Sequence, residues 1–259
     1  MAHQSPALPG HAGRAFFAGH KNSTKESDMT AETAVKERPI IFTGEMVRAI
    51  LDGRKTQTRR AVKPAPKMVK ISERSTAPWD GDPATLKKLL DENKRGCPYG
   101  QPGDRLWVRE THGYEIRSVG GTPHEQIAYR ASNPESVRCY DCNGVAQPMK
   151  WRPSIHMPRW ASRILLEVVS VRVERLQEIS EADAKTEGLS ELSKDGNLYK
   201  FGIPDREGFP GTDDHGWPWV DWKHNARNAF WQLWESINGA GSWDENPFVW
   251  VVTFKRIPQ

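Results

Sequence analysis

The chain lacks the features of a membrane or secreted protein. No apolar run approaches the roughly 18 residues that a membrane-spanning helix needs, and only three of the 259 residues are cysteine. A small, odd number of cysteines favours a reducing cytosol over a disulfide framework. The apolar island Ala15–Ala18 near the start is too short for a signal-peptide core. We therefore expect a soluble, cytoplasmic protein that does not bind membranes.

Hydrophobic periodicity is missing from the first part of the chain. Residues 1–38 are rich in alanine, histidine, glycine, serine, threonine and lysine, which predicts a disordered N-terminal extension. Met29 leads directly into the patterned part, so it is an alternative start of the protein. We expect residues 39–257 to form a single domain.

Carboxylates are absent from Gly53 to Ser72, a stretch that contains seven lysine and arginine residues. The net charge of +4 does not by itself indicate a nucleic-acid partner. The local cluster is better evidence, because it concentrates anions, of which nucleic acid is the commonest polymer. A solvated basic turn is the alternative. The segment also places the hydroxyls of Thr56 and Thr58 among lysine and arginine, an arrangement that can support acyl transfer if the pKa of the lysine is lowered.

The hydrophobic pattern predicts three main helices and several strands. The helices run from Thr43 to Leu51, from Ser180 to Glu187 and from Ala226 to Ile237. The expected strands are Pro39–Phe42, Arg59–Val62, Arg105–Arg109, Ile127–Arg130, Ile164–Leu176 and Phe248–Phe254. A phase shift in the long strand predicts a β-bulge near Val169–Ser170. This is an α+β pattern around a small, mostly antiparallel sheet or barrel, with long loop insertions near 64–102, 131–150 and 189–221.

The order of these elements resembles the ASCH domain, a branch of the PUA-like β-barrel superfamily. The resemblance is carried by G-R-K-T-Q-T-R-R (Gly53–Arg60), by the G-D-x-L-x-V strand at Gly103–Val108, by the L-x-x-I-S-E-x-D-A helix and by the aromatic final strand. The stretch W-R-P-S-I-H-M-P-R-W-A-S-R (Trp151–Arg163) is similar to ASCH proteins of phages and prophages. The resemblance covers roughly Glu37–Arg256. It implies a PUA-like β-barrel with flanking helices, and a cleft beside the first helix that holds RNA or a modified nucleobase.

The resemblance also implies a set of catalytic residues. One bacterial branch of the family, the N4-acetylcytidine amidohydrolases, uses a lysine and a threonine of a K-T-x-T motif and a glutamate on a later helix. The matching residues here are Lys55, Thr58 and Glu187. Residues three apart on a straight strand face opposite sides, so Lys55 and Thr58 share a site only if the chain bends at Thr56–Gln57. An ASCH-type ribonuclease and a non-catalytic phage interaction protein are the alternatives.

Nucleic-acid contacts are expected on two walls of such a cleft. The first is the cationic segment, through Arg54, Arg59, Arg60 and Lys63. The second is Arg159 and Trp160, because a guanidinium can clamp a phosphate and an indole can stack on a base. Packing of Trp160 into the core is the alternative. The expected partner is RNA or a modified nucleoside, whereas protein partners stay open.

A zinc site is a second interpretation of the cysteines. Cys139-x-x-Cys142 together with Cys97 and one of three histidines, His112, His124 or His156, would supply three sulfurs and one nitrogen. A second paired motif is missing, so free thiols are favoured and no metal or cofactor is predicted.

Overall fold

The structure is a computed structural model that describes residues 35–63, 68–72, 75–78, 82, 86–87, 96–212 and 215–258. Most of the predicted N-terminal extension and much of the insertion near 64–102 lie outside the described residues. The described residues belong to one unit, Val35–Gln259. Its first strand begins at Glu37, two residues before the predicted domain boundary.

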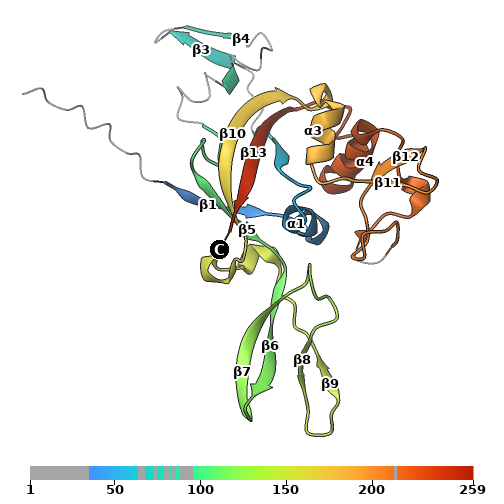
Figure 1. The fold of residues 1–259 in the computed structure, drawn as a ribbon. Coiled ribbons are helices and arrows are strands. Elements are labelled where there is room, and N and C mark those ends of the chain that lie inside the picture. Colours follow the sequence, from blue (N-terminus) through green and yellow to red (C-terminus); the bar gives the residue numbers. More distant parts are fainter. Residues whose placement is uncertain are drawn as a thin grey trace, which may run out of the picture. The chain divides into compact units, whose positions relative to one another are not determined.

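A five-stranded sheet forms the centre of the fold (Figure 1). Its strands are, in spatial order, β1 (Glu37–Ile41), β5 (Arg105–Arg109), β10 (Leu165–Arg175), β13 (Phe248–Ile257) and β2 (Gln57–Ala61). β1 and β5 are parallel, and the other pairs are antiparallel. The register of β10 against β13 shifts between Val168 and Ser170, which confirms the predicted bulge.

The edges of this sheet are β1 and β2, so its strand pairings do not close into a barrel. The two edges are linked by a side chain, because the Arg60 guanidinium donates a hydrogen bond of 2.7 Å to the Ile41 carbonyl. The rings of Phe42 and Phe254 also meet, with centroids 6.1 Å apart. The predicted α+β class is confirmed, and the predicted barrel is replaced by an open, curved sheet.

Four hairpins extend the fold beyond the central sheet. They are β3 (Met68–Ser72) with β4 (Ser75–Pro78), β6 (His112–Val119) with β7 (Thr122–Tyr129), β8 (Val137–Tyr140) with β9 (Ala146–Pro148), and β11 (Ser190–Ser193) with β12 (Tyr199–Gly202). The pattern predicted loops where the last two hairpins lie, and in β7 it predicted strand only from Ile127 onward. The reason is burial: β7 is exposed until its last three residues and β9 throughout, so neither shows apolar alternation.

The three predicted helices are confirmed as α1 (Gly44–Leu51), α3 (Glu181–Thr186) and α4 (Ala226–Asn238). The Ser180 hydroxyl caps α3 by accepting a hydrogen bond of 3.1 Å from the Asp183 N–H. Thr43 occupies the N-cap of α1, but its side chain makes no capping hydrogen bond. Short 3-10 segments complete the structure: η1 (Ser154–His156), η2 (Arg159–Ala161), η3 (Leu176–Glu178) and η5 (Trp219–Asp221).

Two hydrophobic clusters share strand β13. The first packs α1 against the central sheet and includes Val47 and Trp250. The second packs α3 and α4 and includes Trp234 and Val251. Alternate residues of β13 enter different clusters, so both of its faces are buried. No helix within the described ranges is long and apolar enough to cross a membrane.

Candidate functional site

The chain turns sharply between α1 and β2, where the basic motif lies. Gly53 adopts a left-handed conformation (φ +77°) after the last helical turn, a backbone that glycine tolerates best. Lys55 then forms an isolated β-bridge with Glu187, and β2 begins only at Gln57. Lys55 therefore lies before the strand that contains Thr58. The rule that residues three apart on a straight strand face opposite sides does not apply to this pair.

Lys55 and Glu187 are in direct contact inside the protein. The Lys55 Nζ donates to the Glu187 Oε2 at 2.9 Å and to the Glu187 backbone carbonyl at 2.8 Å. The Lys55 side chain is 0% exposed and that of Glu187 3%. Burial lowers the pKa of the Lys55 amine, and the Glu187 carboxylate opposes this shift. The structure thus brings together two of the three residues of the implied catalytic set.

Thr58 lies beside this pair but the space around it is closed. It lines a cavity of about 50 Å³ together with Glu187, room for one or two water molecules. The cover is α4, through Phe230, Leu233 and Trp234. All three are 5% exposed or less and belong to the second hydrophobic cluster. A nucleoside can reach Thr58 only if a core helix leaves its place.

The prediction that Arg59 contacts a phosphate is corrected by the structure, because the Arg59 side chain points into the protein. Its side chain is 0% exposed and meets three carboxylates, at 2.6 Å (Glu174), 3.0 Å (Asp183) and 2.9 Å (Glu187). Burial disfavours the guanidinium charge, but these carboxylates raise the pKa of Arg59 overall. Asp183 and Glu187 are four residues apart at α3, a spacing that places two carboxylates on one face of a helix. This spacing in the sequence could have indicated a partner for a buried cation.

The rest of the predicted cationic wall is dispersed. Arg54 donates to Asp52 at 2.8 Å and to the Gly188 carbonyl at 2.7 Å. Arg60 bridges to Ile41, as described, and its guanidinium lies over the Phe42 ring, 5.4 Å from the centroid. Lys63 is exposed. The segment from Arg54 to Lys63 therefore holds structural elements together and does not form one exposed basic surface.

The second predicted wall is exposed. The Trp160 side chain is 69% exposed, so the alternative prediction, that it packs into the core, is wrong. The centroid of the Trp160 ring lies 6.5 Å from that of the Tyr114 ring. The Arg152 guanidinium lies over the Tyr114 ring, 4.7 Å from its centroid. Arg159 is 41% exposed and donates to Glu37 at 2.8 Å. This arrangement presents an indole face next to cations on the surface.

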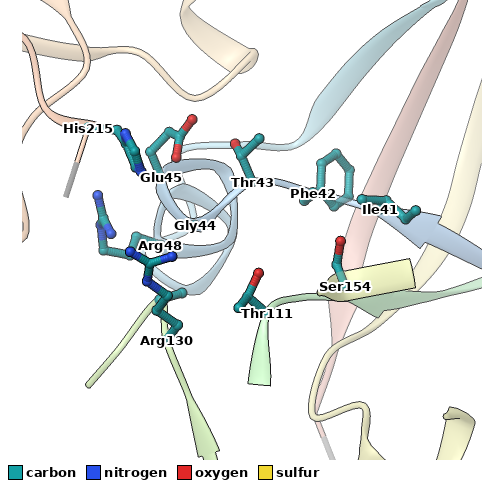
Figure 2. Close-up of a pocket in the computed structure, with 11 residues that line it drawn as sticks. Ile41, Phe42, Thr43, Gly44, Glu45, Arg48, Thr111, Arg130, Ser154 and His215 are labelled. Carbon is teal, nitrogen blue, oxygen red and sulfur yellow. The ribbon is translucent and has the colours of Figure 1, made fainter. Parts of the chain in front are cut away.

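A larger cleft opens at the start of α1 (Figure 2). The resemblance implied a cleft beside this helix, but none of the residues that line it was predicted as a site residue. It has a volume of about 380 Å³. Its polar lining consists of three hydroxyl groups, two guanidinium groups, a histidine and a carboxylate, from Thr43, Thr111, Ser154, Arg48, Arg130, His215 and Glu45. Figure 2 shows His215, Arg48 and Arg130 on one side of the cleft and Phe42, Ile41 and Ser154 on the other.

The charges of this cleft favour an anion. Arg130 is exposed and makes no ion pair or side-chain hydrogen bond with any described residue. The first turn of α1 adds the positive end of a helix dipole, and Thr43 leaves its N–H groups uncapped. Glu45 offsets part of this charge. His215 has a left-handed backbone (φ +68°), a strained conformation for a residue with a side chain and one that is common in ligand sites.

The cysteine and histidine set considered for zinc is not assembled. Across the described ranges, no group of three or more His, Cys, Asp or Glu side chains could hold a metal ion. Cys97, Cys139 and Cys142 form no disulfide bond.

Comparisons with known proteins add no relative: no protein-family model matches the chain, and neither a curated protein nor a solved structure matches it. The resemblance to the ASCH domain thus depends on the sequence motifs alone.

Proposed function

We propose that this protein is an ASCH-type nucleic-acid-binding module that holds a nucleotide of RNA, or a modified nucleobase, in the cleft at the start of α1. The observation that carries the proposal is the cleft itself. Its volume of about 380 Å³ lies within the range of small-molecule sites. It combines an apolar wall at Phe42 with cations, hydroxyl groups and a helix N-terminus.

Each part of a nucleotide has a matching group in this cleft. Arg48 and Arg130 suit a phosphate, because guanidinium groups donate paired hydrogen bonds to its oxygens. The Thr43, Thr111 and Ser154 hydroxyls suit the sugar and the base edge, since a hydroxyl both donates and accepts. The exposed Trp160 supplies a second surface on which a neighbouring base can stack.

Titration of the full chain with single-stranded RNA at low salt tests the proposal. We expect binding whose logarithm falls linearly with the logarithm of the salt concentration, with a slope of about −0.7 for each phosphate neutralised. Undetectable binding of RNA, DNA and N4-acetylcytidine at low salt would reject it. In that case a stable protein partner would favour the interaction-protein alternative, and degradation of the RNA would favour the ribonuclease.

Hydrolysis of N4-acetylcytidine is a second candidate function. The contact of Lys55 with Glu187, the lowered pKa of Lys55 and the cavity shared by Thr58 and Glu187 favour it. The cover by α4 opposes it. Release of acetate from N4-acetylcytidine by the purified protein is the test, with Lys55→Arg as the diagnostic variant. A guanidinium cannot give up its proton near neutral pH, so this variant would be inactive if Lys55 acts as a base. No turnover by the wild type would eliminate this substrate.

A further inference from the structure

A second hollow adjoins the cleft at the start of α1. It has a volume of about 180 Å³, and its lining includes Arg54 just beyond α1 and the loop Pro204–Arg206. Arg48 and Ala131 line both hollows. The two hollows therefore adjoin each other beside α1, whose eight residues span about 12 Å.

The far hollow contains two arginines that each pair with an exposed carboxylate. Arg54 is 26% exposed and pairs with Asp52, which is 55% exposed. Arg206 is 31% exposed and pairs with Glu135, which is 71% exposed. Exposed pairs of this kind contribute little to stability, so a phosphate can replace either carboxylate at small cost.

The remaining carboxylate of the far hollow is occupied within its own loop. The Asp205 Oδ1 accepts hydrogen bonds of 2.9 Å from the N–H groups of Glu207 and Phe209. These bonds hold the carboxylate toward the loop backbone and offset part of its charge. The far hollow can thus accept an anion between Arg54, Arg206 and the shared Arg48.

We infer that the ligand is a single-stranded oligonucleotide and not a free nucleoside. One nucleotide occupies the cleft at the start of α1, and the adjoining phosphodiester lies across the far hollow against Arg54 and Arg206. A single strand is required because the base must leave its stack to enter the cleft. This inference rests on the proposed function and extends it from one nucleotide to a strand.

Cytidine monophosphate and single-stranded hexamers of RNA and of DNA are the probes that test the inference. We expect the wild-type chain to bind a hexamer more tightly than the mononucleotide. Arg206→Gln should weaken hexamer binding roughly tenfold at low salt and reduce the salt slope by about 0.7. It should leave binding of the mononucleotide unchanged, because Arg206 does not line the first cleft. Arg54→Gln is the second variant, and its thermal unfolding is measured because Arg54 also donates to Gly188.

Arg117→Gln is the matched control. Arg117 is 62% exposed and pairs with Glu115 on the β6–β7 hairpin, outside the lining of both hollows. Equal affinity for hexamer and mononucleotide, or equal loss for both in Arg206→Gln, would overturn the inference while leaving the proposed function intact. Failure of every probe to bind would instead reject the proposed function. Tighter binding of the RNA or of the DNA hexamer supports the inference and identifies the natural backbone.

Discussion

Two regions of the molecule use similar side chains: the buried cluster of Lys55, Arg59 and Glu187, and the open cleft of Arg48, Arg130 and His215. In the buried cluster every cation meets a carboxylate at 2.6 to 3.0 Å, and the Lys55 and Arg59 side chains are 0% exposed. In the cleft, Arg130 is exposed and has no ion-pair partner among the described residues. Residue type alone does not assign a role to a basic motif. The role depends on whether each positive charge has a carboxylate beside it and whether solvent can reach it. We therefore propose that the buried cluster serves stability and the cleft serves binding.

The largest effect is expected from breaking the buried cluster. Glu187→Ala would leave the buried side chains of Lys55 and Arg59 each short of one carboxylate. We expect a loss of about 3 to 5 kcal/mol in the free energy of unfolding, as for other buried pairs that lose one member. Denaturant titration measures it. Glu191→Gln is the control, because Glu191 is 43% exposed in its pair with Lys185, and a loss of similar size there would contradict the assignment.

Trp160→Ala should act on binding and spare stability. The indole is 69% exposed, so its removal should change the free energy of unfolding by about 0.5 kcal/mol or less. If a base stacks on it, affinity for single-stranded RNA should fall by about 1 to 3 kcal/mol. Fluorescence anisotropy with labelled RNA, beside thermal unfolding, separates the two quantities. Unchanged affinity would remove Trp160 from the binding surface.

Acid should destabilise the protein through the buried side chain of His112. His112 is 0% exposed, and burial lowers its pKa, with Arg152 acting in the same direction and Glu110 against it. The unfolded chain therefore binds this proton more readily than the folded chain. Stability contributed by neutral His112 is complete above about pH 6.5 and is lost as the pH falls toward the lower pKa of the folded state.

Stability curves between neutral and mildly acidic pH check this expectation. His112→Phe should flatten the acid side of the curve relative to the wild type. Parallel acid slopes in both proteins would show that His112 does not carry this pH dependence.

The smallest effect is expected at the rim of the far hollow. Asp52→Asn removes the partner of Arg54 in a pair whose side chains are 26% and 55% exposed. Such pairs contribute about 0 to 1 kcal/mol, so the unfolding midpoint should barely move. Affinity for single-stranded RNA should rise slightly, because a carboxylate that competes with phosphate is gone. A loss of affinity would place the strand elsewhere.

The sequence predicted the elements whose burial follows a strong period. The spacing of Ala226, Phe230 and Leu233 defined α4, and the bounds of β5 were predicted as observed. The exposed hairpins were missed because their strands pack no continuous face against the core. The burial of Arg59 could not be predicted from the run of basic residues either. It depends on the carboxylates of Glu174 and Glu187, which lie more than 100 residues away in the sequence.

The candidate site also has a part that the sequence indicated and a part that it did not. The resemblance placed Lys55 and Glu187 in one implied site, and the structure shows their side chains in contact. The resemblance implied a cleft beside the first helix, but no motif named the residues that line it, because they come from segments around residues 41–48, 111, 130, 154 and 215. Arg130 carries no local signal. It directly follows β7 and lines the cleft together with Arg48.

The affinity of Arg130→Gln for single-stranded RNA, measured with its thermal stability, tests the central assignment most directly. Because Arg130 has no ion-pair partner among the described residues, we expect an unfolding midpoint equal to that of the wild type. We also expect a clear loss of RNA affinity and a salt slope reduced by about 0.7. Wild-type affinity and salt slope in a folded Arg130→Gln protein would contradict the account.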